Sequence, residues 1–80
     1  LPEWEYLVSQ IVDNSLFSQA IELCSQIISA KGIISEKELE FMCKLCTDIN
    51  IRPEVIDGVI ECLKLNAERM HKWNTLVQKI

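Results

Sequence analysis

A single glycine, Gly32, separates the most continuous apolar stripe of the chain from a helix-starting signal, and this arrangement restricts the fold most. The signal is Ser35 followed three residues later by Glu38, which is the spacing of a capping box. A glycine at the end of an apolar helical stripe is typical of a helix that closes in the left-handed conformation. The segment therefore predicts two helices joined by a short corner.

The corner also has the spacing of the second half of a calcium loop. With Gly32 at the turn position of such a loop, Glu38 falls where calcium loops carry a bidentate glutamate. The positions of the first three oxygen ligands hold Ile27, Ser29 and Lys31 instead. Lys31 would bring a positive charge to the position of the cation. We therefore expect a degenerate EF-hand-like corner without calcium, in which Glu38 serves to cap a helix.

Apolar residues recur at helical spacing before and after this corner, which predicts three helices in the first part of the chain. We expect Asn14 or Ser15 to be the N-cap of the second helix. The expected apolar faces are Trp4, Leu7, Val8 and Ile11 within residues 3–13; Phe17, Ala20, Ile21, Cys24, Ile27 and Ile28, widened by Leu16 and Leu23, within 16–30; and Leu39, Met42, Cys43, Cys46 and Ile49 after Ser35, with Phe41 and Leu45 beside them.

Pro53 suits the first turn of a fourth helix. No glycine or proline follows Leu65, so this helix is expected to continue to Ile80, with a break near residue 66 as the alternative. A heptad-like seam runs along it, formed by Ile56, Ile60, Leu63, Ala67, Met70, Asn74 and Val77, with Val59, Trp73 and Ile80 nearby.

The length and composition fit one small domain. The chain has 80 residues, of which 49% are hydrophobic, and only 2 Gly and 2 Pro are available for turns. We predict an all-α fold, a compact bundle of four to five helices with a long last helix, over residues 1–80. Because the chain starts at Leu1 without Met and has no signal-peptide pattern, we expect a domain excised from a larger protein or a processed chain.

Several classes of function do not fit the sequence. The net charge is -4 and the basic residues are scattered, which argues against nucleic-acid binding. No apolar run approaches the roughly 18 residues of a membrane span. The chain has no glycine-rich phosphate loop and no pattern of catalytic residues. We therefore expect neither an enzyme nor a cofactor, and predict no metal site.

The four cysteines leave alternatives open. They are Cys24, Cys43, Cys46 and Cys62. Thiols at apolar helical positions are usually free and behave as small hydrophobic side chains, which would suit a reducing, cytoplasmic location. The other reading is a metal- or redox-sensing module, in which Cys43 and Cys46 are joined by Cys24, Cys62 or His71.

Residues 21–65 resemble the TerB-like helical domains of tellurite-resistance proteins. That family pairs an Ala-Asp-Gly-x-Ile-Ser turn and a Glu-rich helix with a second turn of the Gly-Leu-Ser-Pro-Glu type. The corresponding segments here are residues 30–35 and 49–54, which read Ala-Lys-Gly-Ile-Ile-Ser and Ile-Asn-Ile-Arg-Pro-Glu. The resemblance implies a helical fold. The family's turn Asp, which is associated with metal, falls on Lys31, so that property is not carried over.

The last helix is the best candidate for a functional surface. Met70, Trp73, Val77 and Ile80 offer more apolar surface than the first three helices can cover, and Trp and Met are favoured in interfaces. The helix either folds back on the domain or projects from it. We predict a protein–protein interaction or scaffolding module that contacts another protein or itself through this face. The alternatives are the cysteine module and a helical bundle that binds a small apolar ligand.

Overall fold

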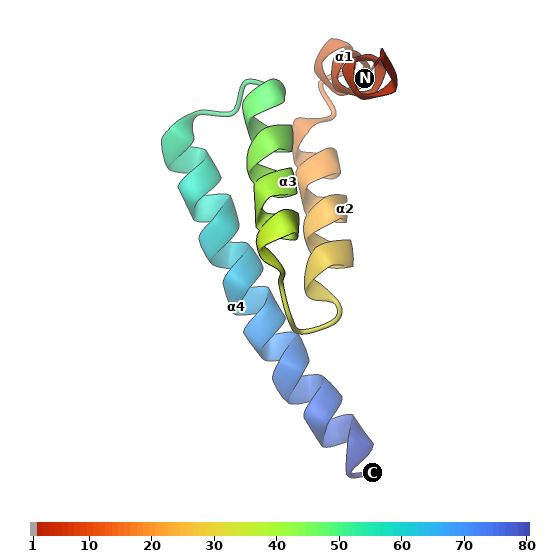
Figure 1. Cartoon of the computed structure of the whole chain (residues 1–80), viewed down its shortest axis with the longest axis vertical. Coiled ribbons are helices and arrows are strands. Elements are labelled where there is room, and N and C mark those ends of the chain that lie inside the picture. Colours follow the sequence, from red (N-terminus) through yellow and green to blue (C-terminus); the bar gives the residue numbers. More distant parts are fainter. Residues whose placement is uncertain (1) are drawn as a thin grey trace.

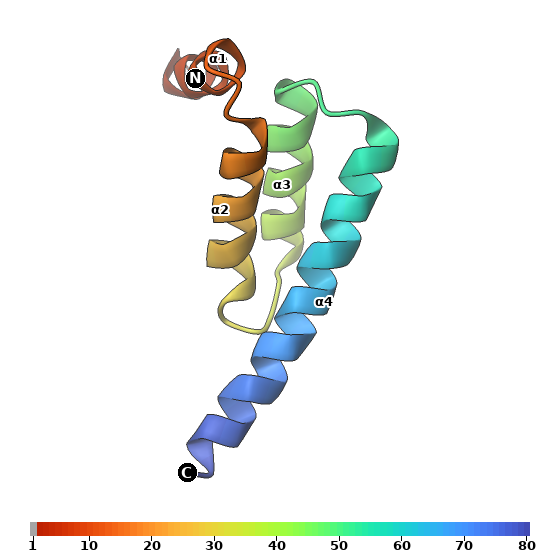
Figure 2. The same cartoon turned by 180° about the vertical axis from the view of Figure 1, so that it is seen from behind.

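The computed structural model describes residues 2–80 and arranges them as four helices without a strand (Figure 1). They are α1 (Pro2–Asp13), α2 (Phe17–Ser29), α3 (Glu36–Asp48) and α4 (Pro53–Gln78). Helices α2, α3 and the first half of α4 lie side by side, and α1 runs across the end of α2 in both views (Figures 1 and 2). The predicted all-α class and the long last helix are confirmed.

Two adjoining clusters of buried side chains form the core. Ile21 and Cys24 on α2 and Ile51 before α4 pack against both clusters, so the two are continuous. The buried members are Ile28, Met42, Cys46 and Leu63 between α2, α3 and α4, and Ile11, Leu45 and Ile49 between α1 and α3 with its C-terminal turn.

The buried face of α3 differs from the expected one by a shift around the helix. Leu45 is 1% exposed and belongs to the core, whereas Cys43 is exposed, so the prediction that placed Cys43 on the apolar face is wrong. Met42, Leu45, Cys46 and Ile49 follow the i, i+3, i+4, i+7 spacing of one helical face. Cys43 follows Met42 by one residue and therefore lies about 100° around the helix from it.

The junction between α1 and α2 also differs from the prediction. Ser15 has a φ of 54°, and the N–H of Leu16 donates to the carbonyl of Ile11 at 2.9 Å, which closes α1 in a Schellman-type turn. Asn14 donates from Nδ2 to the carbonyl of Gln10. The N-cap of α2 is Leu16, with no side-chain cap. The predicted N-cap at residue 14 or 15 is wrong, because both residues serve to close α1.

A polar contact fixes α1 on the end of α3. The indole Nε1 of Trp4 donates to Asp48 Oδ2 at 2.7 Å, and Lys44 Nζ lies 3.0 Å from the same oxygen. The Trp4 ring also meets Phe41 edge to face, with 5.7 Å between the ring centroids. The indole hydrogen bond, and next the Lys44 ammonium, hold the pKa of Asp48 below its usual value. The charged carboxylate is therefore the form that binds α1.

The predicted corner is present and packs against α4. Gly32 has a φ of 82°, in the left-handed region. Its Cα lies so close to α4 that an added Cβ would be 2.7 Å from the Cα of His71. The capping box is confirmed, since Ser35 Oγ accepts from the N–H of Glu38 and the N–H of Ser35 donates to the Glu38 carboxylate. The corner therefore sets where α4 passes the end of α2 and α3.

Candidate functional site

The last helix extends well past the rest of the domain. It has 26 residues, whereas α2 and α3 have 13 each, so it is about 39 Å long. It is unbroken, which excludes the alternative of a break near residue 66. Its last turns project beyond the corner between α2 and α3 (Figures 1 and 2). Of the two arrangements considered from the sequence, the structure has the projecting one.

The contacts of α4 with its own domain end at the corner. His71 packs under Gly32, and Asn74 Nδ2 reaches the carbonyl of Ala30 at a long 3.5 Å. Farther along, the helix ends in exposed apolar side chains. We call residues 70–80 the tail.

The tail carries the four residues predicted as the interaction surface. Met70 is half-buried, while Trp73 is 58%, Val77 47% and Ile80 102% exposed. Leu76 is 56% exposed and was missed, although it follows Trp73 by three residues and so lies on the same face. The four exposed side chains form an apolar end of the molecule that no other described residue covers; they are Trp73, Leu76, Val77 and Ile80.

The heptad-like seam predicted for α4 faces the core for only part of its length. Leu63 and Ala67 are buried, and Ile56 and Ile60 pack against the first core cluster. Val77, in the same seam, is exposed because it lies beyond the corner, where none of the described residues of α1, α2 or α3 covers the helix. The domain therefore uses the seam down to the corner and no farther.

A second seam lies beside the first and was not recognised from the sequence. It has alternating steps of three and four residues, as in a coiled coil. The sequence pattern from which it could have been predicted is a second set of mostly apolar residues at this spacing. Its members are Val55, Val59, Cys62, Asn66, Arg69, Trp73, Leu76 and Ile80.

The first half of this second seam borders an open groove between α2 and α4. The groove has a volume of about 410 Å³. Gly58 is one of its lining residues, and an added Cβ there would meet nothing within 4 Å. Its lining residues are Ile21, Ser25, Val55, Gly58, Val59, Cys62, Leu63 and Asn66. We call this space the α2–α4 groove.

The EF-hand-like corner holds a lysine at a position where a calcium loop has an oxygen ligand. Lys31 Nζ lies 3.2 Å from Glu38 Oε2, so the side chain in a ligand position pairs with the carboxylate that would close the loop. The N–H of Ser35, above all, and then the Lys31 ammonium hold the pKa of Glu38 below its usual value. The two other altered ligand positions hold Ile27, which is exposed, and Ser29, whose hydroxyl donates to the carbonyl of Ser25. Within the corner, the Lys31 ammonium thus neutralises the carboxylate that a calcium loop would offer to the ion.

The cysteines do not form a common site. Cys46 is buried, Cys24 is half-buried, and Cys43 and Cys62 are exposed on different helices. Burial raises the pKa of the Cys24 and Cys46 thiols, which disfavours the thiolate needed for metal binding or redox chemistry. Among residues 2–80, no three His, Cys, Asp or Glu side chains lie close enough together to hold an ion.

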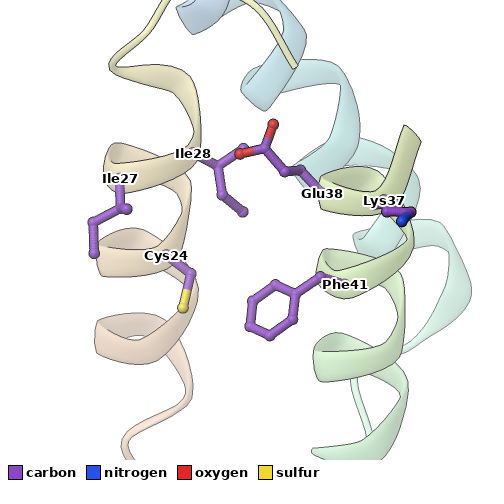
Figure 3. Close-up of a pocket in the computed structure, with 6 residues that line it drawn as sticks. All are labelled: Cys24, Ile27, Ile28, Lys37, Glu38 and Phe41. Atoms are coloured by element: carbon purple, nitrogen blue, oxygen red, sulfur yellow. The ribbon is translucent and has the colours of Figure 1, made fainter. Parts of the chain in front are cut away.

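A second apolar groove lies between α2 and α3 (Figure 3). Cys24 and Phe41 point into the space between the two helices, and Lys37 and Glu38 lie on the α3 side. The groove has a volume of about 340 Å³ and adjoins a hollow of about 300 Å³ toward α1, which shares Cys24 and Phe41 with it. Both spaces are open to solvent.

Comparisons with protein-family models, curated proteins and solved structures find no match for this chain. The resemblance to TerB-like domains therefore stays a prediction from two short turns. In the part of the chain that the structure describes, no helix combines the length and the apolar character that a bilayer crossing requires. The candidate site consequently depends on the geometry of α4 alone.

Proposed function

We propose that this chain is a protein–protein interaction module whose contact surface is the tail of α4. The observation that carries the proposal is that the tail projects beyond the corner with Trp73, Leu76 and Val77 exposed. Burying a large aliphatic or aromatic side chain gains about 1.5–3 kcal/mol, so leaving several in water forgoes substantial stability. A partner that covers them would recover it.

The shape of the site supports a helix-in-groove or helix–helix mode of binding. The tail is helical as far as Gln78 before it meets a partner, so little conformational entropy is lost on binding. Its apolar side chains lie on one face, while Thr75 and Gln78 lie on the polar side. Such a surface resembles the anchors that dominate the energy of many interfaces, in which Trp is enriched.

Site-specific photocross-linking in the native cells tests this proposal. A benzophenone amino acid replaces Leu76 in one variant. In a matched control it replaces Thr75, which precedes Leu76 and lies on the polar side of the helix. We expect a discrete protein adduct from position 76, much less from position 75, and loss of the adduct when Trp73→Asp is added. An adduct of equal yield at both positions, or one that survives Trp73→Asp in a folded chain, would refute the proposal.

Binding of a small apolar ligand is a second candidate, supported by the two adjoining hollows that share Cys24 and Phe41. Titration with a fluorescent fatty-acid analogue measures it directly. Saturable binding that weakens at least about tenfold in Phe41→Ala, and not in Trp73→Ala, would support the groove. Unsaturable binding, or equal effects of the two changes, would argue against it.

A further inference from the structure

We propose that the partner of the tail is a second copy of this chain, bound through antiparallel pairing of the two α4 helices. This inference rests on the proposed function and names its partner. The tail of each copy would lie in the α2–α4 groove of the other. Because the same surface is then used twice around a two-fold axis, the assembly closes as a dimer.

The second seam of α4 is complementary to itself in the antiparallel direction. In one register every member of the seam meets another member, with apolar layers outside and two symmetry-related polar layers at the centre. An antiparallel coiled coil pairs seam positions in this way. Four pairs make up these layers, and the two-fold axis repeats each of them once. With the residue of the first copy named before that of the second, they are Val55 with Ile80, Val59 with Leu76, Cys62 with Trp73, and Asn66 with Arg69.

Charge on α4 is segregated in the sense that this pairing requires. The half that borders the groove carries three acids and one base, and the half that contains the tail carries three bases and one acid; in chain order these are Glu54, Asp57, Glu61 and Lys64, then Glu68, Arg69, Lys72 and Lys79. Antiparallel pairing sets unlike halves against each other at both ends. Parallel pairing would place the two acidic halves beside each other, and likewise the two basic halves. The two helix dipoles also oppose each other in the antiparallel arrangement.

The flanking positions agree with the same register. Lys72 and Lys79 lie on one side of the seam, and in the dimer they approach Glu61 and Glu54 of the other copy. All four side chains are exposed in the single chain, and only Glu54 has an ion-pair partner among the described residues, Arg52 at 3.8 Å. These charges are therefore available to a second copy.

Gly58 has a role in this assembly that it lacks in the single chain. A glycine inside a helix costs about 1 kcal/mol relative to alanine, and nothing in its own domain approaches Gly58. In the dimer Gly58 lies opposite Lys79 of the second copy. Without a side chain at residue 58, the stem of Lys79 can cross the helix toward Glu54. The open groove and the projecting tail are thus two halves of one interface.

Charge exchange between two variants of the 80-residue chain tests the pairing. The first variant is Glu54→Lys with Glu61→Lys, and the second is Lys72→Glu with Lys79→Glu. Each is measured alone and in an equimolar mixture by sedimentation velocity over a range of concentrations. Glu5→Lys with Glu40→Lys makes the same charge change as the first variant on α1 and α3, away from α4, and serves as the control. Circular dichroism confirms that each variant is folded.

We expect the unaltered chain and the control to dimerise, each variant alone to self-associate at least about tenfold more weakly, and the mixture to recover a dimer of one copy of each. A dimer that the mixture does not restore would overturn the antiparallel pairing. A chain that stays monomeric would refute the proposal that the partner is a second copy. The unaltered chain is also mixed with phosphatidylserine vesicles, and a monomer that sediments with them would refute the same proposal. A cross-link from position 76 to a different protein would leave the proposed function standing while this inference fails.

Discussion

Replacing Gly32 by alanine should destabilise the domain, whereas the same replacement at Gly58, the other glycine of the chain, should not. Two independent costs meet at Gly32. Its φ of 82° is disfavoured for any residue with a Cβ, and the added Cβ would lie 2.7 Å from the Cα and 2.8 Å from the N of His71. These atoms belong to the backbone of α4 and cannot rotate away as a side chain could.

The magnitude follows from these two costs. The left-handed conformation costs about 1–2 kcal/mol for a residue other than glycine. Crowding of a packed contact costs about 1–3 kcal/mol, because the corner and α4 must move apart. The expected loss in the free energy of unfolding is therefore about 2–5 kcal/mol. A domain of this size has only about 5–10 kcal/mol in total, so the change is a large fraction.

Equilibrium unfolding in urea, followed by circular dichroism, measures the effect. Gly58→Ala is the matched control, since it adds the same methyl group in open space within a helix. We expect this control to gain up to about 1 kcal/mol in the free energy of unfolding. Both variants are measured at concentrations at which the chain is monomeric, so that any dimer does not contribute. A loss below about 1 kcal/mol in Gly32→Ala would refute the reasoning, because it would mean that the corner relaxes away from α4 freely.

Three further predictions concern the corner, the thiols and the core. Because the pKa of Glu38 is lowered in the folded chain, its contribution to the free energy of unfolding is present above the ordinary carboxyl pKa of about 4.3 and is lost as the pH falls through the folded value. Acid titration of Glu38→Gln should accordingly show a shallower fall in stability between about pH 5 and 3, and a slope equal to that of the unaltered chain would contradict this. Cys43 should react with a thiol reagent in the folded protein, whereas Cys46, with 0% exposure, should react only at the rate of unfolding; equal rates would refute the assigned burial. Leu63→Ala should cost about 2–5 kcal/mol in urea unfolding, since Leu63 is 1% exposed within the main core cluster, and a smaller loss would mean that the site collapses around the cavity.

Much of the fold could be predicted because its signals are local. The capping box at Ser35 and Glu38 depends on residues three apart, and it is present as expected. The positive φ of Gly32 follows from the place of a glycine after a helical stripe. Pro53 opens α4 because its missing N–H costs nothing at the first helical turn. Short-range spacing was sufficient for each of these.

The errors occurred where two local patterns competed. Ser15 has the right chemistry for an N-cap, yet the end of α1 needed a left-handed residue at that position. On α3 both Cys43 and Leu45 lie near the apolar face, and only the placement of α1 and α2 against α3 decides that Leu45 is buried. Burial of this kind depends on neighbouring helices that are far apart in the sequence.

The sequence by itself favoured a long α4, because no glycine or proline follows Leu65, and it left a break near residue 66 as the alternative. It also placed Trp73, Val77 and Ile80 as candidates for a contact surface. Only the tertiary structure decided that these residues project, since the corner at Gly32 lies beside His71 and the described residues leave Trp73, Val77 and Ile80 exposed. The α2–α4 groove around Gly58 was likewise invisible, because a groove belongs to the space between two helices and not to the spacing within either one.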